Sequence, residues 1–201
     1  MVTTHMAAQT LKQAFDPFVN LELRVWENFA QLGEVKAFKK EAVLKAAHAT
    51  EKYFNVLLTG SGGNLIWAKN NFVCIDIAFA KEFLLDYTSF AMQQPSPIEV
   101  CVFEDSTVFR ISHHAFQQVF EAGNHGEKVT RLVVEASLLA KQQQQIDLMT
   151  KTARERYLDI LRTHPGMART PLKYLASYLG VTPQSLSRIR ADKQAELPKG
   201  K

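Results

Sequence analysis

The side chains best suited to chemistry lie near the C-terminus, on a segment that we expect to be helical. Leu186 and Ile189 are three residues apart, a spacing that places both on one buried stripe. The opposite face then carries hydrogen-bond donors of the types that bind base edges and phosphates. This outward set is Gln184, Ser185, Ser187, Arg188 and Arg190. An acidic or apolar face would argue against DNA, and this face is neither.

A shorter helix must precede this one and hold it in place. Residues 171–179 carry apolar side chains at helical spacing. Gly180 suits the position just past a helix end, because glycine adopts a left-handed backbone without a Cβ clash. Thr182 can then cap the next helix, with Pro183 at its first position. Two helices joined in this way are typical of a helix-turn-helix, which places its second helix in a DNA groove.

The charge of the chain is uneven, and its basic part coincides with this motif. Residues 151–201 contain 11 Lys and Arg against 4 Asp and Glu, which leaves 13 of the 24 basic and 16 of the 20 acidic residues in 1–150. A positive end attracts a nucleic-acid duplex, with an affinity that falls steeply as salt is added. The alternative is a solvated basic tail, which accounts for Lys199 and Lys201 but not for the ordered turn before them.

Composition places the 201-residue chain among ordinary soluble globular proteins, with 46% hydrophobic and 22% charged residues. This length allows one sizeable domain and a small one. The sequence has neither a run of eighteen apolar residues nor a signal-peptide pattern, so we expect no membrane partner and a cytoplasmic location. Cys74 and Cys101 lie in apolar surroundings typical of small buried hydrophobes, and their spacing matches no common zinc motif. We expect no metal and no cofactor.

The organisation of the chain before the motif changes twice. Residues through 33 show helical spacing, and residues 35–111 then show short apolar or alternating runs typical of an all-β sandwich or barrel. The glycine-rich segment 60–63 predicts a tight turn, 93–97 predicts a loop, and Ser112 can cap a following helix. The expected strands cover residues 35–38, 53–58, 65–68, 72–79, 98–103 and 108–111.

A longer helix is predicted after Gly126. Apolar residues, with Gln143 as one polar position that can fix the register, recur along it by threes and fours. This heptad stripe suits pairing with a second copy of the same helix. The stripe consists of Val129, Leu132, Ala136, Leu139, Gln143 and Ile146. The alternative is a helix lying on its own β domain, which Val133, Leu138 and Ala140 would fit, and opposite faces can serve both contacts. Another amphipathic helix is expected over 152–163, ending before His164-Pro165-Gly166.

No arrangement of residues indicates catalysis. The histidines never occur as a His-x-His pair, and the adjacent His113 and His114 are typical of capping or surface groups. Glu104 and Asp105 belong to an expected turn, and the glycine run lacks the lysine of a phosphate-binding loop. We therefore expect a protein that is not an enzyme.

In this order, the N-terminal helical piece, the β domain, the heptad helix and the helix-turn-helix resemble the Crp/Fnr family of bacterial transcription regulators. The resemblance is most specific over 174–190, and Phe38-Lys39-Lys40, Leu58-Thr59-Gly60 and Phe103-Glu104-Asp105-Ser106 resemble the family's cyclic-nucleotide-binding jelly roll. It implies an α+β fold with a jelly-roll (double-stranded β-helix) sensor domain over 1–125, a dimerisation helix over 126–150 and an all-α helix-turn-helix domain over 151–201. It also implies a homodimer that reads a roughly twofold site in double-stranded DNA.

The resemblance places Gln184 and Arg188 at base-reading positions. Pro183 stands where some relatives carry a base-contacting arginine, so the preferred DNA sequence should differ. Little chain remains after Arg190 for the β-hairpin wing of many relatives. The whole predicted DNA-binding set is Arg169, Thr170, Lys173, Thr182, Pro183, Gln184, Ser185, Ser187, Arg188 and Arg190.

The predicted sensor site departs from that of relatives that bind cyclic AMP. Those relatives hold the ribose with a Gly-Glu pair and the phosphate with a downstream arginine, and this chain has Leu85-Asp86 and Ser96 there. Because an uncompensated anion is costly to bury, we expect no cyclic-AMP binding of the family type. The effector is either an unidentified small molecule or absent. A ligand-binding or protein-interaction module whose helix-turn-helix does not read DNA remains the alternative function.

Overall fold

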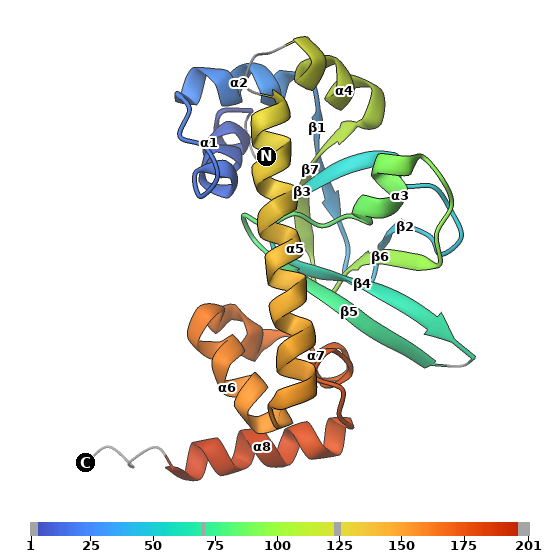
Figure 1. Ribbon diagram of the computed structural model, residues 1–201, viewed down its shortest axis with the longest axis vertical. Helices are drawn as coiled ribbons and strands as arrows, with labels where there is room; N and C mark the ends of the chain where they lie inside the picture. Colours follow the sequence, from blue (N-terminus) through green and yellow to red (C-terminus); the bar gives the residue numbers. More distant parts are fainter. Residues whose placement is uncertain (1–3, 70, 123–125, 197–201) are drawn as a thin grey trace.

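The computed structural model describes residues 4–69, 71–122 and 126–196. A β domain occupies the upper part of the molecule in Figure 1, beneath a cap of N-terminal helices, and the C-terminal helices form its lower end. The long helix α5 (Gly126–Thr150) runs along one side and connects these two parts. The molecule thus mixes helix and sheet, as the sequence predicts.

Two antiparallel sheets form the β domain. The first has the strand order β1-β7-β3 and the second the order β2-β6-β4-β5. The alternating and apolar runs of the sequence all become strands. Strand β3 is buried on both faces, whereas β1 is largely exposed and belongs to the sheet through its pairing with β7. The bounds are β1 (Glu34–Phe38), β2 (Val43–Lys45), β3 (Tyr53–Thr59), β4 (Ser61–Ala68), β5 (Asn71–Phe79), β6 (Ile98–Val102) and β7 (Ser106–Ser112).

The glycine-rich segment is only partly the turn that the sequence predicts. Gly60 has a φ of 90° and makes the turn, whereas Gly62 and Gly63 belong to strand β4. A Cβ on Gly63 would lie 2.5 Å from the ring of Phe103, and one on Gly62 would lie 2.5 Å from Leu84. These two glycines therefore allow close packing within the β domain and not a longer turn.

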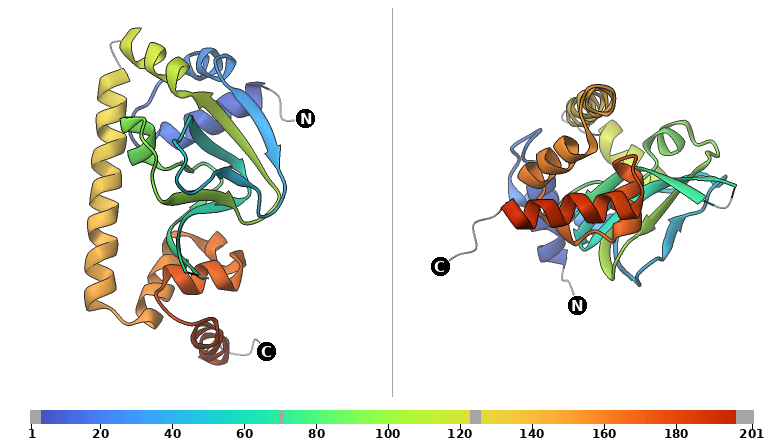
Figure 2. Two further views of the ribbon diagram at one scale, coloured as in Figure 1. Left: turned by 90° about the vertical axis from the view of Figure 1, so that its right-hand side faces the viewer. Right: turned by 90° about the horizontal axis from the view of Figure 1, so that it is seen from below.

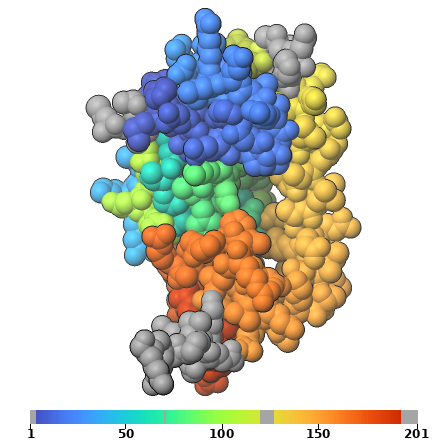
Figure 3. All heavy atoms as spheres, turned by 90° about the vertical axis from the view of Figure 1, so that its left-hand side faces the viewer, coloured from blue at the N-terminus to red at the C-terminus, as the bar shows by residue number. Residues whose placement is uncertain are grey.

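Helices α1 (Thr4–Phe15), α2 (Leu23–Gln31) and α4 (His113–Ala122) pack on the three-stranded sheet. The contact is rich in aromatic rings: Phe15 stacks on Trp26 at 4.7 Å between centroids, and Phe54 stacks on Phe116 at 4.8 Å. The N–H of Ala115 donates to the Ser112 hydroxyl, which confirms the predicted cap of α4. Figure 3 shows α1 and α2 as a continuous cover over this end of the molecule.

The C-terminal part consists of α6 (Ala153–Thr163), a 3₁₀ helix η1 (Pro165–Arg169), α7 (Leu172–Tyr178) and α8 (Pro183–Glu196). Thr152 and Glu155 form a capping box at the start of α6, and the helix ends at Thr163, directly before the predicted stop signal His164-Pro165-Gly166. No helix in the part of the chain that the structure describes is long and apolar enough to cross a membrane.

A single apolar core joins the C-terminal helices to the four-stranded sheet, an arrangement that the sequence did not predict. The ring of Tyr174 on α7 stacks on Phe103 with centroids 3.8 Å apart and planes 10° apart. The Ser177 hydroxyl accepts from the N–H of Cys74 and donates to the carbonyl of Phe72, both on the edge strand β5. Helix α7 thus covers an edge that would otherwise present unpaired backbone groups.

Candidate nucleic-acid interface and sensor site

The turn between α7 and α8 is built from the residues that the sequence singles out. Gly180 has a φ of 69°, in the left-handed region that glycine favours, and Val181 donates its N–H back to the carbonyl of Ala176. The Thr182 hydroxyl accepts from the N–H of Ser185 at 3.1 Å and caps α8. Leu186 is fully buried, which fixes α8 on α6 and α7.

Helix α8 presents a polar face to solvent. It lies across the lower end of the molecule, away from both sheets (Figures 1 and 2). Eight residues of the predicted DNA-binding set are exposed: Arg169, Lys173, Thr182, Pro183, Gln184, Ser185, Ser187 and Arg188. All of them except Arg169 and Lys173 lie on the first turns of α8 or at its cap, whereas Arg169 ends η1 and Lys173 lies on α7. The contact of these residues with DNA stays a prediction.

Two other residues of the predicted set need correction. Thr170 is only 3% exposed, with its hydroxyl directed to the sulfur of Met167, so it is not available to a phosphate. The Arg190 guanidinium lies over the ring of Tyr157 at 5.9 Å, and its Nε and Nη2 atoms are buried. Arg190 thus points inward and not outward as predicted.

Lys173 is exposed but already has a partner. Its ammonium group donates to a carboxylate oxygen of Glu41 at 2.6 Å, and this hydrogen bond raises the pKa of Lys173. Glu41 lies between β1 and β2, so the ion pair links α7 to the β domain. A phosphate would have to compete with Glu41 for this lysine.

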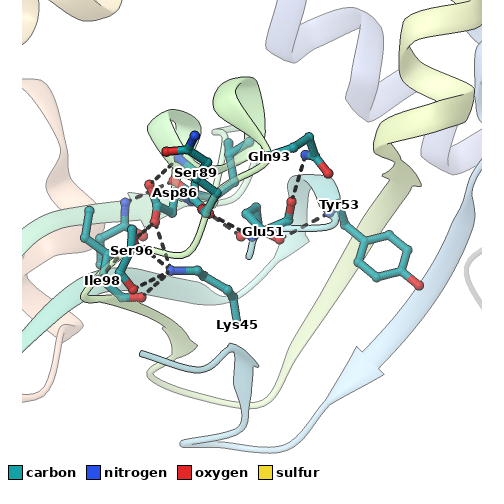
Figure 4. Close-up of polar contacts among 11 residues, drawn as sticks. Lys45, Glu51, Tyr53, Asp86, Ser89, Gln93, Ser96 and Ile98 are labelled. Carbon is teal, nitrogen blue, oxygen red and sulfur yellow. Dashed lines mark hydrogen bonds and ion pairs between the residues drawn. The ribbon is translucent and has the colours of Figure 1, made fainter. Parts of the chain in front are cut away.

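In the β domain, the predicted phosphate-site residues form a closed polar network (Figure 4). The Lys45 ammonium donates to Asp86 and to the Ser96 hydroxyl, both at 2.9 Å, and to the carbonyl of Ile98 at 2.6 Å. Ser96 also donates to Asp86, while Leu85 packs in the apolar core. The side chains of Lys45 and Asp86 are 2% and 1% exposed, so this is a buried ion pair.

Asp86 serves a second purpose as the N-cap of the short helix α3 (Tyr87–Met92), because it accepts from the N–H of Ser89 at 3.1 Å. Burial tends to raise the pKa of Asp86, but the hydrogen bonds from Ser96, Lys45 and Ser89 outweigh burial and lower it. The carboxylate is therefore ionised, and its negative charge is matched by Lys45.

Glu51 lies beside this network and is 1% exposed. Its carboxylate accepts from the N–H groups of Tyr53 at 3.2 Å and Asp86 at 3.5 Å (Figure 4). Burial dominates these contacts and raises the pKa of Glu51 to about 7. Neither Lys45 nor Glu51 is predicted from the sequence, although a lysine directly after the apolar pair Val43-Leu44 is a signal that was available.

The two cysteines are buried, as expected, and burial raises the pKa of each thiol to about 12. Both are therefore protonated and inert at neutral pH. Among the residues that the structure describes, no three His, Cys, Asp or Glu side chains gather in a way that could hold a metal ion.

The predicted pairing stripe on α5 divides into a covered and an open part. Val129 is 4% exposed and packs in the core of the β domain, so it cannot meet a second copy. Leu132 and Ala136 are half-buried, whereas Leu139, Gln143 and Ile146 are exposed. The alternative of a helix lying on its own domain thus holds for the first turns of α5.

The open part of α5 exposes more apolar surface than the predicted stripe. Leu138 and Met149 are 67% and 80% exposed and lie on the same side as Leu139 and Ile146. On its other side, α5 borders a cleft of about 520 Å³ that also touches β5, α6 and α7. Gln143 lines this cleft, and Figure 3 shows the hollow between α5 and the rest of the molecule.

Comparison with known proteins places the fold. The sequence matches no protein-family model and no curated protein. The structure is similar to FixK2 from Bradyrhizobium japonicum (14% identity, TM-score 0.67, covering 82% of this chain and 85% of that chain). It is also similar to the c-di-GMP-responsive global regulator CLP from Xanthomonas campestris (14%, 0.62, 87% and 93%). A cyclic nucleotide-binding domain from Methylobacillus flagellatus matches as well (13%, 0.63, 72% and 83%).

These neighbours are cyclic nucleotide-binding domain proteins and regulators of the Crp/Fnr type. At 13–14% identity the likeness establishes the fold. The chain therefore has the mixed helix-and-sheet fold, with antiparallel sheets, of this class of regulatory protein.

Proposed function

We propose that this protein is a homodimeric, sequence-specific transcription regulator of the Crp/Fnr type that binds double-stranded DNA. The observation that carries the proposal is the exposed donor face of α8, fixed by a glycine turn and by the burial of Leu186. The surplus of basic residues in 151–201 and the likeness in fold to FixK2 and CLP support it. Gln184 and Arg188 are the proposed base-reading residues.

Fluorescence anisotropy with a pool of DNA duplexes, followed by selection of the bound sequences, tests this function. We expect Arg188→Ala to weaken binding to the selected duplex. Because Arg188 is proposed to read a base and not a phosphate, its loss should reduce the preference for the selected duplex over unrelated duplexes by about 1–3 kcal/mol for each half-site, and it should leave the slope of log affinity against log salt nearly unchanged. Arg162→Ala removes the same charge from an exposed position on α6 and should change neither quantity. Absence of salt-dependent binding by the unaltered protein would refute the proposal.

The proposed dimer forms along the open part of α5. A second copy would cover the exposed apolar side chains of Leu138, Leu139, Ile146 and Met149. Burying them against the same side chains of the partner removes apolar surface from water, which favours pairing. Analytical ultracentrifugation should show a dimer for the unaltered protein and a monomer for Leu139→Glu. Ser137→Glu, which adds the same charge on the side of the cleft, is the matched control and should stay dimeric.

The sensor domain is proposed not to bind cyclic AMP in the manner of the family. A cyclic phosphate at the predicted site would meet the Asp86 carboxylate, and the adjacent Lys45 ammonium is already shared among Asp86, Ser96 and Ile98. Removing that cation from Asp86 would leave a buried charge without a partner. Saturable binding of cyclic AMP in calorimetry would contradict this expectation. Binding of another, unidentified small-molecule effector is compatible with this proposal.

One observation favours the alternative of an interaction module. Helix α7 buries Tyr174 and Leu175 against the β domain, so the two-helix unit already has a packing role. The alternative predicts that Arg188→Ala leaves partner binding intact and that no duplex is bound at low salt.

A further inference from the structure

The side chain of Arg156 joins the ends of two helices. Its Nη1 atom donates to the carbonyl oxygen of Lys151 at 2.5 Å, and its Nη2 atom donates to the carbonyl oxygen of Leu179 at 2.6 Å. Lys151 follows the last residue of α5 and donates its backbone N–H to the carbonyl oxygen of Asp147, while Leu179 is the C-cap of α7. One guanidinium group on α6 therefore closes the C-terminal ends of both α5 and α7.

This arrangement is favourable for a specific electrostatic reason. The last carbonyl groups of a helix lack partners within the helix and carry the negative end of its dipole. Two such ends face Arg156, and the planar fork of a guanidinium matches two separate acceptors at once. The ammonium group of a lysine is a point charge on a flexible stem, so it cannot reproduce this geometry.

The other polar contacts at this junction connect only α5 and α6, and not α7. Lys151 bonds Asp147 at 3.2 Å and Asp159 at 2.9 Å, and the Thr152–Glu155 capping box begins α6. These contacts join α5 to α6. The Arg156 contacts extend the connection from α5 to the end of α7, directly before the turn that positions α8.

We propose that Arg156 is a positioning residue that sets the spacing between the two DNA half-sites recognised by the dimer. The inference rests on the proposed function. In such a dimer, the paired α5 helices define the symmetry axis and α8 reads each half-site. The separation of the two α8 helices then depends on the angle between α5 and the α7–α8 unit, which Arg156 holds. Half-site spacing is a geometric property of this kind of protein.

The test compares Arg156→Lys with Arg162→Lys on the duplex selected by the unaltered protein. Both arginines lie on α6, and the control removes only an exposed contact to Asp159. Affinity is measured for the selected site, for versions with one or two base pairs added or removed at its centre, and for an isolated half-site. Ultracentrifugation and circular dichroism establish that each variant is dimeric and folded.

We expect Arg156→Lys to lose about tenfold in affinity for the selected spacing, because the loosened junction should then hold the matching angle for only about a tenth of the time. Its affinity for the altered spacings and for the half-site should stay nearly unchanged, so its preference for one spacing shrinks. Arg162→Lys should behave like the unaltered protein.

Three results would overturn the inference. The first is that Arg156→Lys retains the full spacing preference. The second is that it weakens binding to every duplex by the same factor, because that is the result expected if Arg156 only stabilises the fold. The unaltered protein could also tolerate all spacings equally, a result that needs no variant and so holds even if Arg156→Lys does not fold. Failure of the unaltered protein to bind any duplex is a separate outcome, because it removes the proposed function itself.

Discussion

Removing the cation from the buried ion pair of the β domain should be strongly destabilising. In Lys45→Met the side-chain volume is nearly kept, but Asp86 stays 1% exposed and loses the ammonium group 2.9 Å away. Breaking one half of a buried pair costs about 3–5 kcal/mol, which is a fifth or more of the stability of a typical domain of about 5–15 kcal/mol. For a chain of this size the midpoint of thermal unfolding should fall by about 10 °C.

A second variant separates the charge effect from packing. Asp86→Asn removes the buried negative charge and retains an acceptor for the cap of α3. Lys45→Met combined with Asp86→Asn should therefore be more stable than Lys45→Met alone, with a coupling energy of about 2 kcal/mol or more. Urea unfolding followed by circular dichroism and tryptophan fluorescence gives all four free energies of unfolding.

The pH dependence gives an independent check of the same pair. The pKa of Asp86 is lowered in the folded protein, so the pair stabilises the fold above the unfolded pKa and loses its effect as pH falls through the folded pKa. In Lys45→Met that pKa should rise, and the stability deficit should shrink towards acid pH. A deficit below about 1 kcal/mol at pH 7, or a double variant as unstable as the sum of the singles, would refute the reasoning.

Three further predictions concern stability. Contact with Glu82 raises the pKa of His164, so this pair should stabilise the fold below the unfolded pKa of His164 and lose its effect as pH rises through the folded pKa. His164→Gln should remove that pH dependence from the midpoint of thermal unfolding. The effect should be well under about 1 kcal/mol because both side chains are more than a third exposed. Burial raises the pKa of Glu51 to about 7, so the stability of the unaltered protein should fall by up to roughly 3 kcal/mol as pH rises from 4.5 through 7, and Glu51→Gln should not show this fall. Tyr174→Leu should cost about 2–3 kcal/mol in urea unfolding through the lost ring stack, and the exposed control Tyr87→Leu well under 1 kcal/mol.

The elements that the sequence predicts well are those whose signals are local. Gly180 and Thr182 determine the turn and the start of α8 with contacts inside that segment, and Thr152 does the same for α6. Strands were predictable where alternation lasts for four residues or more. Strand β2 has three residues and α3 has six, too few for either period to be visible, and both were missed.

The candidate sites were less predictable because they depend on distant partners. Lys45 and Asp86 are 41 residues apart in the chain, so their pairing requires the fold. The error at Arg190 has a local cause, since this residue lies four positions after Leu186 and shares its buried stripe. The long arginine stem then lies along Tyr157 in place of solvent. The same spacing rule, applied one step further, would have placed it correctly.

The stacking of Tyr174 on Phe103, together with the bonds of Ser177 to the edge of β5, limits how this protein can be taken apart. A fragment cut before α6 would expose the apolar side of α7, and the remaining β domain would be left with an open strand edge. A chimera that carries the helix-turn-helix of another protein would need side chains compatible with the β domain at the positions of Tyr174 and Ser177. We therefore expect the β domain and the C-terminal helices to have evolved together, and we do not expect either to be exchanged independently between proteins.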